Sequence, residues 1–303
     1  MFYLGIVLLK LHALPLVLLP RAFFLRLGFA CGELIRFAGF RVPIARANLE
    51  LAFPEKSVEW REALLRKSYQ ELGVLWLELL RLFYRFDRFV ERNCQVEGAE
   101  HLAAARAKGM GVLVLTSHLG NWEVLAASGP NLVNTPVTMV TKRLKPEWLN
   151  RVFEITRSLL GVKMAFEPRT MPAILRALKQ NEAVGFVMDQ YAGAPVGARV
   201  PFFGKAVGSH TALAALALRT GAPVIPAFAA RQRGGHYLIR FEPALILEEK
   251  GEPDERLIAN TALFVRHIEA WIREYPAQWL WIHRRWKGDL SPLPPDSPGV
   301  LLK

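Results

Sequence analysis

The stretch that organises the chain is VLVLTSHLGNWE, residues 112–123. It begins with a short apolar, β-branched run that follows Gly109 and Gly111, which is typical of a buried strand. Gly120 then permits a tight turn, and Asn121 is a favourable N-cap for a helix that begins at the next residue. The sequence therefore predicts a strand, a turn and a helix in this order, with a histidine at the exit of the strand.

The predicted turn brings His118 and Glu123 within reach of each other. Residues five apart on one continuous helix point about 140° apart and cannot meet, but across a strand–turn–helix junction they can. We expect Glu123 to accept a hydrogen bond from one imidazole nitrogen while the other acts as a general base, as in acyl transfer. The alternative is that His118 only makes structural hydrogen bonds at the end of the strand and has no catalytic role. Seven His and 27 acidic residues in 303 predict about 0.6 chance matches to this spacing.

Metal and disulfide chemistry are not indicated by the sequence. The zinc-protease helix requires two histidines four residues apart, and no second histidine lies close to His118 in the sequence. Cys31 and Cys94 are too few for a disulfide scaffold and fit a reducing, cytoplasmic setting. We expect no metal and no cofactor.

The composition points to contact with a membrane and with acidic partners. Hydrophobic residues make up 52% of the 303 residues, and the mean hydropathy is +0.18. The formal net charge of +12 implies nucleic acid, anionic lipid or an acidic protein as partner. Because the basic residues are dispersed or lie beside aromatics, without zinc-finger spacing or an RNA-binding aromatic signature, we disfavour nucleic acid.

The first twenty residues contain two apolar runs separated by Lys10. They are just long enough to span a bilayer core, but Lys10 and Pro15 leave an interfacial helix open as the alternative. A cleaved signal peptide is disfavoured because no basic start precedes the apolar region. The arginines that follow predict that the bulk of the protein lies on the cytoplasmic side of a membrane, where they also attract anionic lipids.

The pattern of apolar residues and predicted elements divides the remaining chain into a helical region at residues 21–94, an α/β core at 95–290 and a Pro-rich tail at 291–303. Residues 21–290 are expected to form one folded unit, with a layered sheet flanked by helices. Within residues 21–94 we expect a short helix ended by Pro54 and a long helical stretch over 58–90. Predicted strands are 112–117, 136–141, 184–189, 223–229 and 237–242, and predicted helices are 99–107, 122–128, 146–159, 170–179, 209–219 and 254–274.

Three further polar residues are candidates for substrate binding. Arg143 follows a predicted strand, Arg157 lies on the next helix, and Asp189 ends another strand. If the strand before Arg143 and that of His118 are parallel neighbours, the loop of Arg143 shares the sheet edge of His118, where ligands of α/β sheets bind. The arginines suit a phosphate or phosphopantetheine, and Asp189 suits orientation of a substrate or an arginine. Ordinary surface cations and a loop or capping carboxylate are the alternative interpretation.

Two aromatic segments each allow two interpretations. VPFFG at residues 200–204 suits either an apolar wall for an acyl chain or packing in the core. WLWIHRRWK at residues 279–287 interleaves aromatics with cations. It fits either a membrane-interface or anionic-headgroup surface, or a buried terminal segment with solvated cationic heads.

Taken together, these residues resemble the bacterial lipid A biosynthesis acyltransferase family, the lauroyl and myristoyl transferases of late lipid A assembly. The similarity extends over nearly the whole chain. Besides the N-terminal hydrophobic stretch, the matching motifs are RANL with FP at 46–49 and 53–54, HLGNWE at 118–123, DQ at 189–190, VPFFG at 200–204, TGAP at 220–223 and QWLWIHRRW at 278–286.

The resemblance implies a glycerolipid acyltransferase-like fold and transfer of a fatty acyl group from acyl carrier protein to a hydroxyl of a lipid A precursor. The family's motif carries its histidine and acid onto His118 and Glu123, and Arg157 and Asp189 fall where the family has functional polar residues. Mycobacterial-type acyltransferases of mannosylated phosphatidylinositol share these motifs, so another glycolipid or a lysophospholipid acceptor remains an alternative. A non-catalytic binder of anionic glycolipid and a metal-dependent hydrolase are the competing hypotheses.

Overall fold

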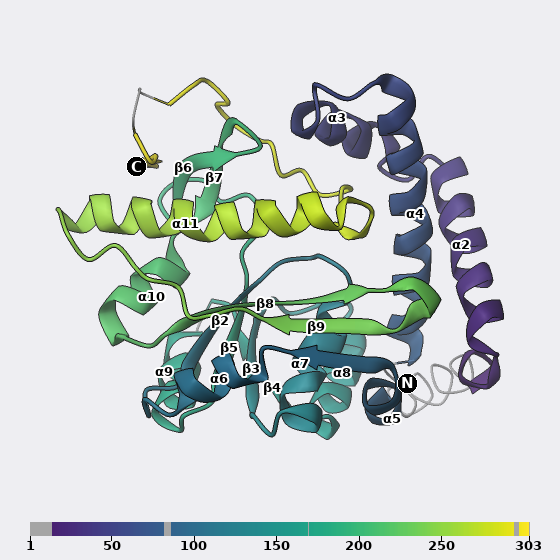
Figure 1. The fold of residues 1–303 in the computed structure, drawn as a ribbon, viewed down its shortest axis with the longest axis horizontal. Coiled ribbons are helices and arrows are strands. Elements are labelled where there is room, and N and C mark those ends of the chain that lie inside the picture. Colours follow the sequence, from purple (N-terminus) through teal and green to yellow (C-terminus); the bar gives the residue numbers. More distant parts are fainter. Residues whose placement is uncertain (1–13, 82–85, 169, 294–296, 303) are drawn as a thin grey trace.

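The computed structural model describes residues 14–81, 86–168, 170–293 and 297–302. A layered α/β body carries a helical region along one side (Figure 1). Most of the apolar N-terminal stretch, residues 1–13, lies outside the described residues. Among the helices that are described, none combines the length and the apolar character needed to cross a bilayer.

The main sheet has seven strands in the order β1-β9-β8-β2-β5-β3-β4. Five neighbouring strands, from β8 to β4, are parallel, whereas β9 is antiparallel to β8 and β1 is parallel to β9. The predicted α/β sheet is therefore confirmed as a mixed sheet. Its strands are β1 (Cys94–Glu97), β2 (Val112–Thr116), β3 (Val137–Thr141), β4 (Val162–Phe166), β5 (Ala183–Val187), β8 (Val224–Arg231) and β9 (Tyr237–Phe241).

Strand β2 lies at the centre of this sheet, and all five of its residues are buried. This explains its unbroken Val/Leu composition, since a parallel strand covered on both faces has no solvated side. One face is covered by α6 (Ala99–Arg106) and α7 (Trp122–Leu132), and the other by α9 (Met171–Lys179), α10 (Ala212–Thr220) and α11 (Pro253–Glu274). α8 (Glu147–Leu159) follows β3 and precedes β4.

The helical region contains α2 (Arg21–Phe37), α3 (Val42–Ala52), α4 (Val58–Arg81) and α5 (Phe86–Asn93). The long helical region predicted over 58–90 corresponds to α4 and α5, and residues 82–85 between them lie outside the described part. α2 packs closely on α4 because both helices carry glycine at the contact. A Cβ on Gly32 would lie 1.9 Å from the carbonyl oxygen of Tyr69. Only one face of α2 is used in this contact.

Several strands were not predicted from the sequence. They are β1, β4 and a hairpin of β6 (Gly197–Phe202) and β7 (Lys205–His210), and α10 begins at Ala212 instead of residue 209. VPFFG at 200–204 belongs to this hairpin, and Phe202 and Phe203 are buried in a cluster with Trp279 and Trp286, so the segment is core and not a wall for a ligand. In the predicted tail, β10 (Val300–Leu301) pairs with β6, and residues 294–296 lie outside the described part.

Candidate active site

His118 lies just beyond the end of β2, where Asp189 holds its imidazole from beyond the end of β5. The two strands are parallel neighbours in which Thr116 pairs with Val187. His118 and Asp189 each follow two residues later, so the register of the sheet brings them together. Nδ1 of His118 lies 2.8 Å from Oδ1 of Asp189. The pair therefore sits at the carboxyl edge of the parallel strands, the usual place for ligands in such sheets.

The buried Asp189 carboxylate accepts three hydrogen bonds. Besides the imidazole, the backbone amide of His118 donates to Oδ2 across 2.9 Å and the indole Nε1 of Trp279 donates to the same oxygen across 2.7 Å. Burial acts to raise the pKa of Asp189, but the contacts with His118 and Trp279 outweigh it and lower the pKa from 3.8 to about 2. An ionised Asp189 requires the proton on Nδ1 of His118, which leaves Nε2 as the basic nitrogen.

Nε2 of His118 is available to a substrate. The side chain is 16% exposed, and no hydrogen bond from any residue that the structure describes engages this nitrogen. A partly exposed imidazole with a buried carboxylate behind it is the arrangement of a general base.

Glu123 does not bond to His118, which corrects the geometry expected from the sequence. Both of its oxygens bind Arg157 on α8: Nε donates to Oε2 across 3.0 Å and Nη2 donates to Oε1 across 2.5 Å. No hydrogen bond or ion pair joins Glu123 to His118, and the structure describes both residues. Desolvation acts to lower the pKa of Arg157, but Glu123 raises it. The pair links α7 to α8, and it occupies Arg157, which was expected to clamp a phosphate.

The turn between His118 and α7 follows the predicted chemistry. Gly120 has a φ of +62°, and a Cβ at this position would lie 1.9 Å from the carbonyl oxygen of Ala229. Only glycine fits here without displacing the neighbouring strand. The side-chain oxygen of Asn121 accepts hydrogen bonds from the amides of Glu123 and Val124 and caps α7. The predicted strand–turn–helix unit is therefore confirmed.

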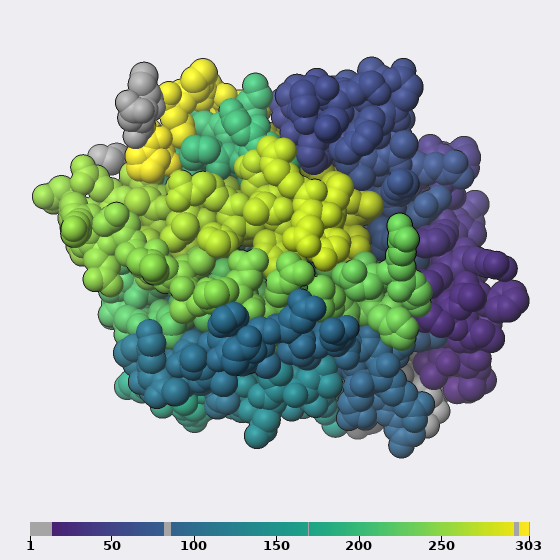
Figure 2. All heavy atoms as spheres, in the orientation of Figure 1, coloured from purple at the N-terminus to yellow at the C-terminus, as the bar shows by residue number. Residues whose placement is uncertain are grey.

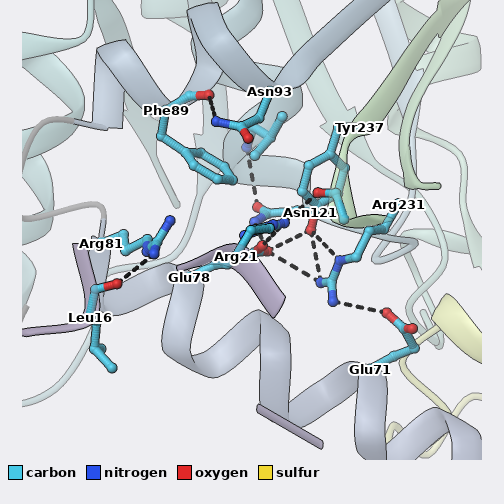
Figure 3. A network of polar contacts seen from close by, with 12 residues as sticks. Leu16, Arg21, Glu71, Glu78, Arg81, Phe89, Asn93, Asn121, Arg231 and Tyr237 are labelled. Atoms are coloured by element: carbon cyan, nitrogen blue, oxygen red, sulfur yellow. Dashed lines mark hydrogen bonds and ion pairs between the residues drawn. The ribbon is translucent and has the colours of Figure 1, made fainter. Parts of the chain in front are cut away.

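A buried polar network ties this turn to the helical region (Figure 3). At its centre is Glu78 of α4, which is 0% exposed. Asn121 donates from Nδ2 to Oε2 of Glu78 across 3.1 Å, and the Tyr237 hydroxyl donates to the same oxygen across 2.5 Å. Arg21 and Arg231 form ion pairs with Glu78 of 2.9 and 3.2 Å. The cap of α7 is thus fixed by a carboxylate from α4.

An apolar pocket lies between α7 and the sheet, beside the histidine. Its empty volume is ≈ 530 Å³, including space open to solvent, and its lining includes Val114, Leu125 and Met139. Trp122 also lines the pocket and packs edge-on against the imidazole of His118, with ring centroids 4.8 Å apart. A Cβ on Gly185 of β5 would meet no atom within 4 Å, so this glycine adds free space to the pocket. The shape and chemistry suit an alkyl chain whose head reaches His118.

Residues 278–287, here called the C-terminal strap, cross the outer side of the turn. The amide of Gly120 donates to the carbonyl oxygen of Gln278 across 2.9 Å, and the amide of Leu280 donates to that of His118 across 3.1 Å. The strap therefore pairs with the turn as a short strand would, and it fixes the backbone of the histidine.

The helical region holds the strap from a second side. Asn48 of α3 donates to the carbonyl oxygens of Trp281 and His283, each across 2.6 Å. Trp281 is buried, whereas Arg284 and Lys287 are exposed. The segment thus combines features of the two sequence-based interpretations: it is buried through Trp281 and Arg285, and it presents the cationic heads of Arg284 and Lys287 at the surface.

His283 of the strap lies next to the candidate base. Its ring centroid is 5.1 Å from that of His118. Burial, together with the neighbouring His118, lowers the pKa of His283 from 6.5 to about 4. The His283 side chain is therefore neutral at pH 7.

Arg143 stands apart from these groups. It lies at the predicted edge of the sheet, but β5 separates its strand β3 from β2. It is exposed, forms a 3.7 Å ion pair with Glu147 and lies over the ring of Phe166 at 4.5 Å. It lines neither the apolar pocket nor the strap. In the described part of the chain, no three His, Cys, Asp or Glu side chains form a group that could hold a metal ion.

Two features of the site were not expected from the sequence. The first is the direct pairing of Asp189 with His118. These residues lie 71 positions apart, and the sequence does not show that β2 and β5 are neighbouring strands. The second is the contribution of Trp279, which supplies a donor to the same carboxylate. Its segment stood out by composition, but composition does not tell which tryptophan turns inward.

Comparisons with known proteins show the family of this chain. Residues 1–288 match the family model described as bacterial lipid A biosynthesis acyltransferase. The chain is 28% identical over 278 residues to the lipid A biosynthesis lauroyltransferase of Escherichia coli (strain K12), and 30% identical over 275 residues to the palmitoleoyltransferase of that strain; each match covers 89% of this chain and 87% of the relative. A phosphatidylinositol mannoside acyltransferase of Mycolicibacterium smegmatis is 28% identical over 252 residues, 81% of this chain and 80% of that protein.

Proposed function

Because the chain belongs to the bacterial lipid A biosynthesis acyltransferase family, we propose that it transfers a fatty acyl group from acyl carrier protein to a hydroxyl of a lipid A precursor. The observation that carries this proposal is the position of His118. Its imidazole is backed by Asp189 and packs against Trp122 of the apolar pocket. A base beside a slot for an alkyl chain is what direct acyl transfer requires.

In the proposed reaction, Nε2 of His118 removes the proton of the acceptor hydroxyl while its oxygen attacks the thioester carbonyl. A C–O bond forms and the C–S bond breaks, so the acyl group becomes an ester and the carrier's thiolate leaves. The imidazolium then returns the proton to the departing sulfur. Asp189 stabilises the imidazolium between the two steps. The acyl donor is a substrate, and the scheme uses no metal and no other cofactor.

Glu123 and Arg157 take a supporting role in this proposal. Their ion pair is buried, with side-chain exposures of 3% and 11%, and joins the first turn of α7 to α8. Trp122, the neighbour of Glu123, contacts both the imidazole and the apolar pocket. The pair therefore fixes the wall along which the acyl chain would lie, and it does not touch the proton that is transferred.

We propose that α2 rests on the cytoplasmic face of the inner membrane. An outward-facing row of large apolar side chains, here called the α2 stripe, consists of Phe23, Leu27, Leu34 and Phe37, which are 60, 41, 68 and 76% exposed. Their spacing places them on one side of the helix, and the opposite side packs on α4. α2 lies at the outer edge of the molecule (Figures 1 and 2). The net charge of +12 favours an anionic lipid surface.

The acceptor is the part of the proposal with a specific alternative. Relatives that cover four fifths of this chain are phosphatidylinositol mannoside acyltransferases, so another glycolipid is the second candidate. The test is incubation of the purified protein with labelled acyl carrier protein thioester and, separately, a lipid A precursor or a phosphatidylinositol mannoside.

Mass spectrometry should find one added acyl group on the lipid A precursor, with release of an equal amount of free carrier thiol, and His118→Ala should abolish both. Acylation of the phosphatidylinositol mannoside alone would show that the mannoside, and not the lipid A precursor, is the acceptor. A protein that retains either glycolipid without changing its mass is a binder, and the proposed reaction would then be wrong.

A further inference from the structure

His283, which packs against His118, also lines a second cleft, at the surface of the molecule. We call it the basic cleft. Its empty volume is ≈ 1030 Å³, including space open to solvent, and its walls come from the start of the α3 segment, the residues after Asp189 and the C-terminal strap. Its charged side chains are Arg41, Arg284 and Lys287.

The basic cleft gathers three cations and no carboxylate. Arg41, Arg284 and Lys287 are all exposed, and no ion pair to an Asp or Glu within the described ranges engages them. Their recorded contacts are uncharged: Nη1 of Arg41 donates to the carbonyl oxygen of Ile282 across 3.2 Å, and Nζ of Lys287 lies 5.8 Å from the ring centroid of Tyr191. Three like charges that share one concave surface repel each other, and an anion relieves that repulsion.

His118 lines neither the basic cleft nor the apolar pocket, but its imidazole contacts one wall residue of each. The imidazole of His118 contacts Trp122, which lines the apolar pocket, and His283, which lines the basic cleft. Two substrates that occupy these two spaces would therefore each lie one side chain away from the same imidazole. Because His283 is neutral at pH 7, it adds hydrogen-bonding capacity to the cleft without adding charge.

The basic cleft also adjoins the membrane-facing side of the molecule. Arg41 follows the end of α2, where Phe37 and Phe40 are 76% and 47% exposed. A lipid whose chains remain in the membrane beside the α2 stripe would place its headgroup next to Arg41 and the basic cleft. The acyl donor, in contrast, has the apolar pocket for its chain.

We propose that the basic cleft binds a phosphate group on the headgroup of the glycolipid acceptor and so presents the acceptor hydroxyl to His118. The inference rests on the proposed function and names the part of the acceptor that the site recognises. Phosphate oxygens accept several charge-assisted hydrogen bonds at once, which arginine and lysine side chains from separate segments can donate.

The test uses the double variant Arg284→Gln/Lys287→Gln, because both side chains are exposed and neither forms an ion pair with the residues that the structure describes. With a phosphorylated lipid A precursor, KM for the acceptor should rise about tenfold, while kcat and KM for the acyl carrier protein thioester stay unchanged. With the same acceptor after chemical dephosphorylation, wild type and variant should be equally weak. The matched control is Lys179→Gln/Arg219→Gln, which removes one lysine and one arginine, both exposed, outside the cleft.

Other results would overturn the inference. A rise of KM for the thioester alone would assign the cleft to the donor's phosphopantetheine, and equal use of both acceptors by wild type would show that phosphate is not recognised. Inorganic phosphate that competes as well as the glycolipid would indicate a free-phosphate site. Calorimetric binding of the phosphorylated acceptor in detergent is independent of turnover, so it tests the cleft even if wild type transfers no acyl group and the proposed function fails.

Discussion

Asp189 is the residue on which the proposed chemistry of His118 depends. A carboxylate that accepts Nδ1–H keeps Nε2 unprotonated and stabilises the charge that appears when Nε2 takes a proton. Glu123 does not occupy this position, because its oxygens bind Arg157 and no hydrogen bond joins it to His118, both of which the structure describes. Two carboxylates near one histidine therefore separate into an orienting group and a structural group, and their substitution should have different consequences.

We predict that Asp189→Asn lowers kcat by about 10³- to 10⁴-fold with little change in KM, since the amide cannot hold the required tautomer. Glu123→Gln is the matched comparison: it changes an acid to its amide in the same motif and should reduce stability more than turnover, because it leaves the buried Arg157 unpaired. Steady-state kinetics and urea unfolding of both variants separate the two effects. A larger loss of kcat in Glu123→Gln would show that Glu123 is the orienting acid.

The ionisation of Asp189 should make the free energy of unfolding depend on pH under acidic conditions. Folding lowers the pKa of Asp189 from 3.8 to about 2, so its contribution is complete above about pH 4 and is lost as the pH falls toward 2. The difference in unfolding free energy between wild type and Asp189→Asn should accordingly shrink by about 2 kcal/mol between pH 6 and pH 2. Urea titrations at several pH values measure this difference. A gap that stays constant over the range would contradict the assignment.

At the scale of elements, the sequence was sufficient for local structure and insufficient for pairing. Gly120 and Asn121 specify a turn and a cap by their own chemistry, so α7 begins where expected. Which strands become neighbours depends on the packing of the whole sheet, and the partner of β2 is β5, with β3 and β4 between them in the chain. The acid that meets His118 was therefore found among the candidates but not recognised as its partner.

The helical region shows the same limit in another form. Glu78 lies within the helical region predicted over residues 58–90, and nothing in the sequence shows that it is buried beneath the cap of α7. Its cost of burial is offset by donors from Asn121, Tyr237, Arg21 and Arg231, which belong to four other segments. Such a network becomes visible only when the helices are placed on the sheet.

The apolar pocket between α7 and β5 should set the length of the acyl chain. Gly185 is the position to test, because an added side chain there would enter the open pocket and not the packed core. We predict that Gly185→Ile lowers kcat/KM for the longest donor used by wild type roughly 10- to 200-fold and leaves shorter donors unaffected, with Gly185→Ala in between. Kinetics with a series of acyl carrier protein thioesters measure the profile. Equal loss for all chain lengths would place the acyl chain elsewhere.

At the scale of the whole molecule, the sites are arranged relative to one proposed membrane surface. The α2 stripe faces outward, the basic cleft lies beyond its end at Arg41, and the apolar pocket lies within the α/β body. The lipid acceptor could thus stay in the membrane while a soluble donor inserts its chain from the protein side. This division requires that α2 contact lipid.

We predict that Leu34→Ser/Phe37→Ser lowers the apparent affinity for phosphatidylglycerol vesicles at least about tenfold, because each lost side chain removes about 1–2 kcal/mol of apolar burial. Both residues are exposed, so the melting temperature should not change. Leu159→Ser/Ile246→Ser is the control, since these side chains are 82% and 93% exposed but lie outside α2. Vesicle sedimentation should also weaken with rising salt for every variant, as charge attraction is screened. If the control pair reduces binding as strongly as the α2 pair, exposed apolar area in general, and not the α2 stripe, governs association, and the orientation proposed here is wrong.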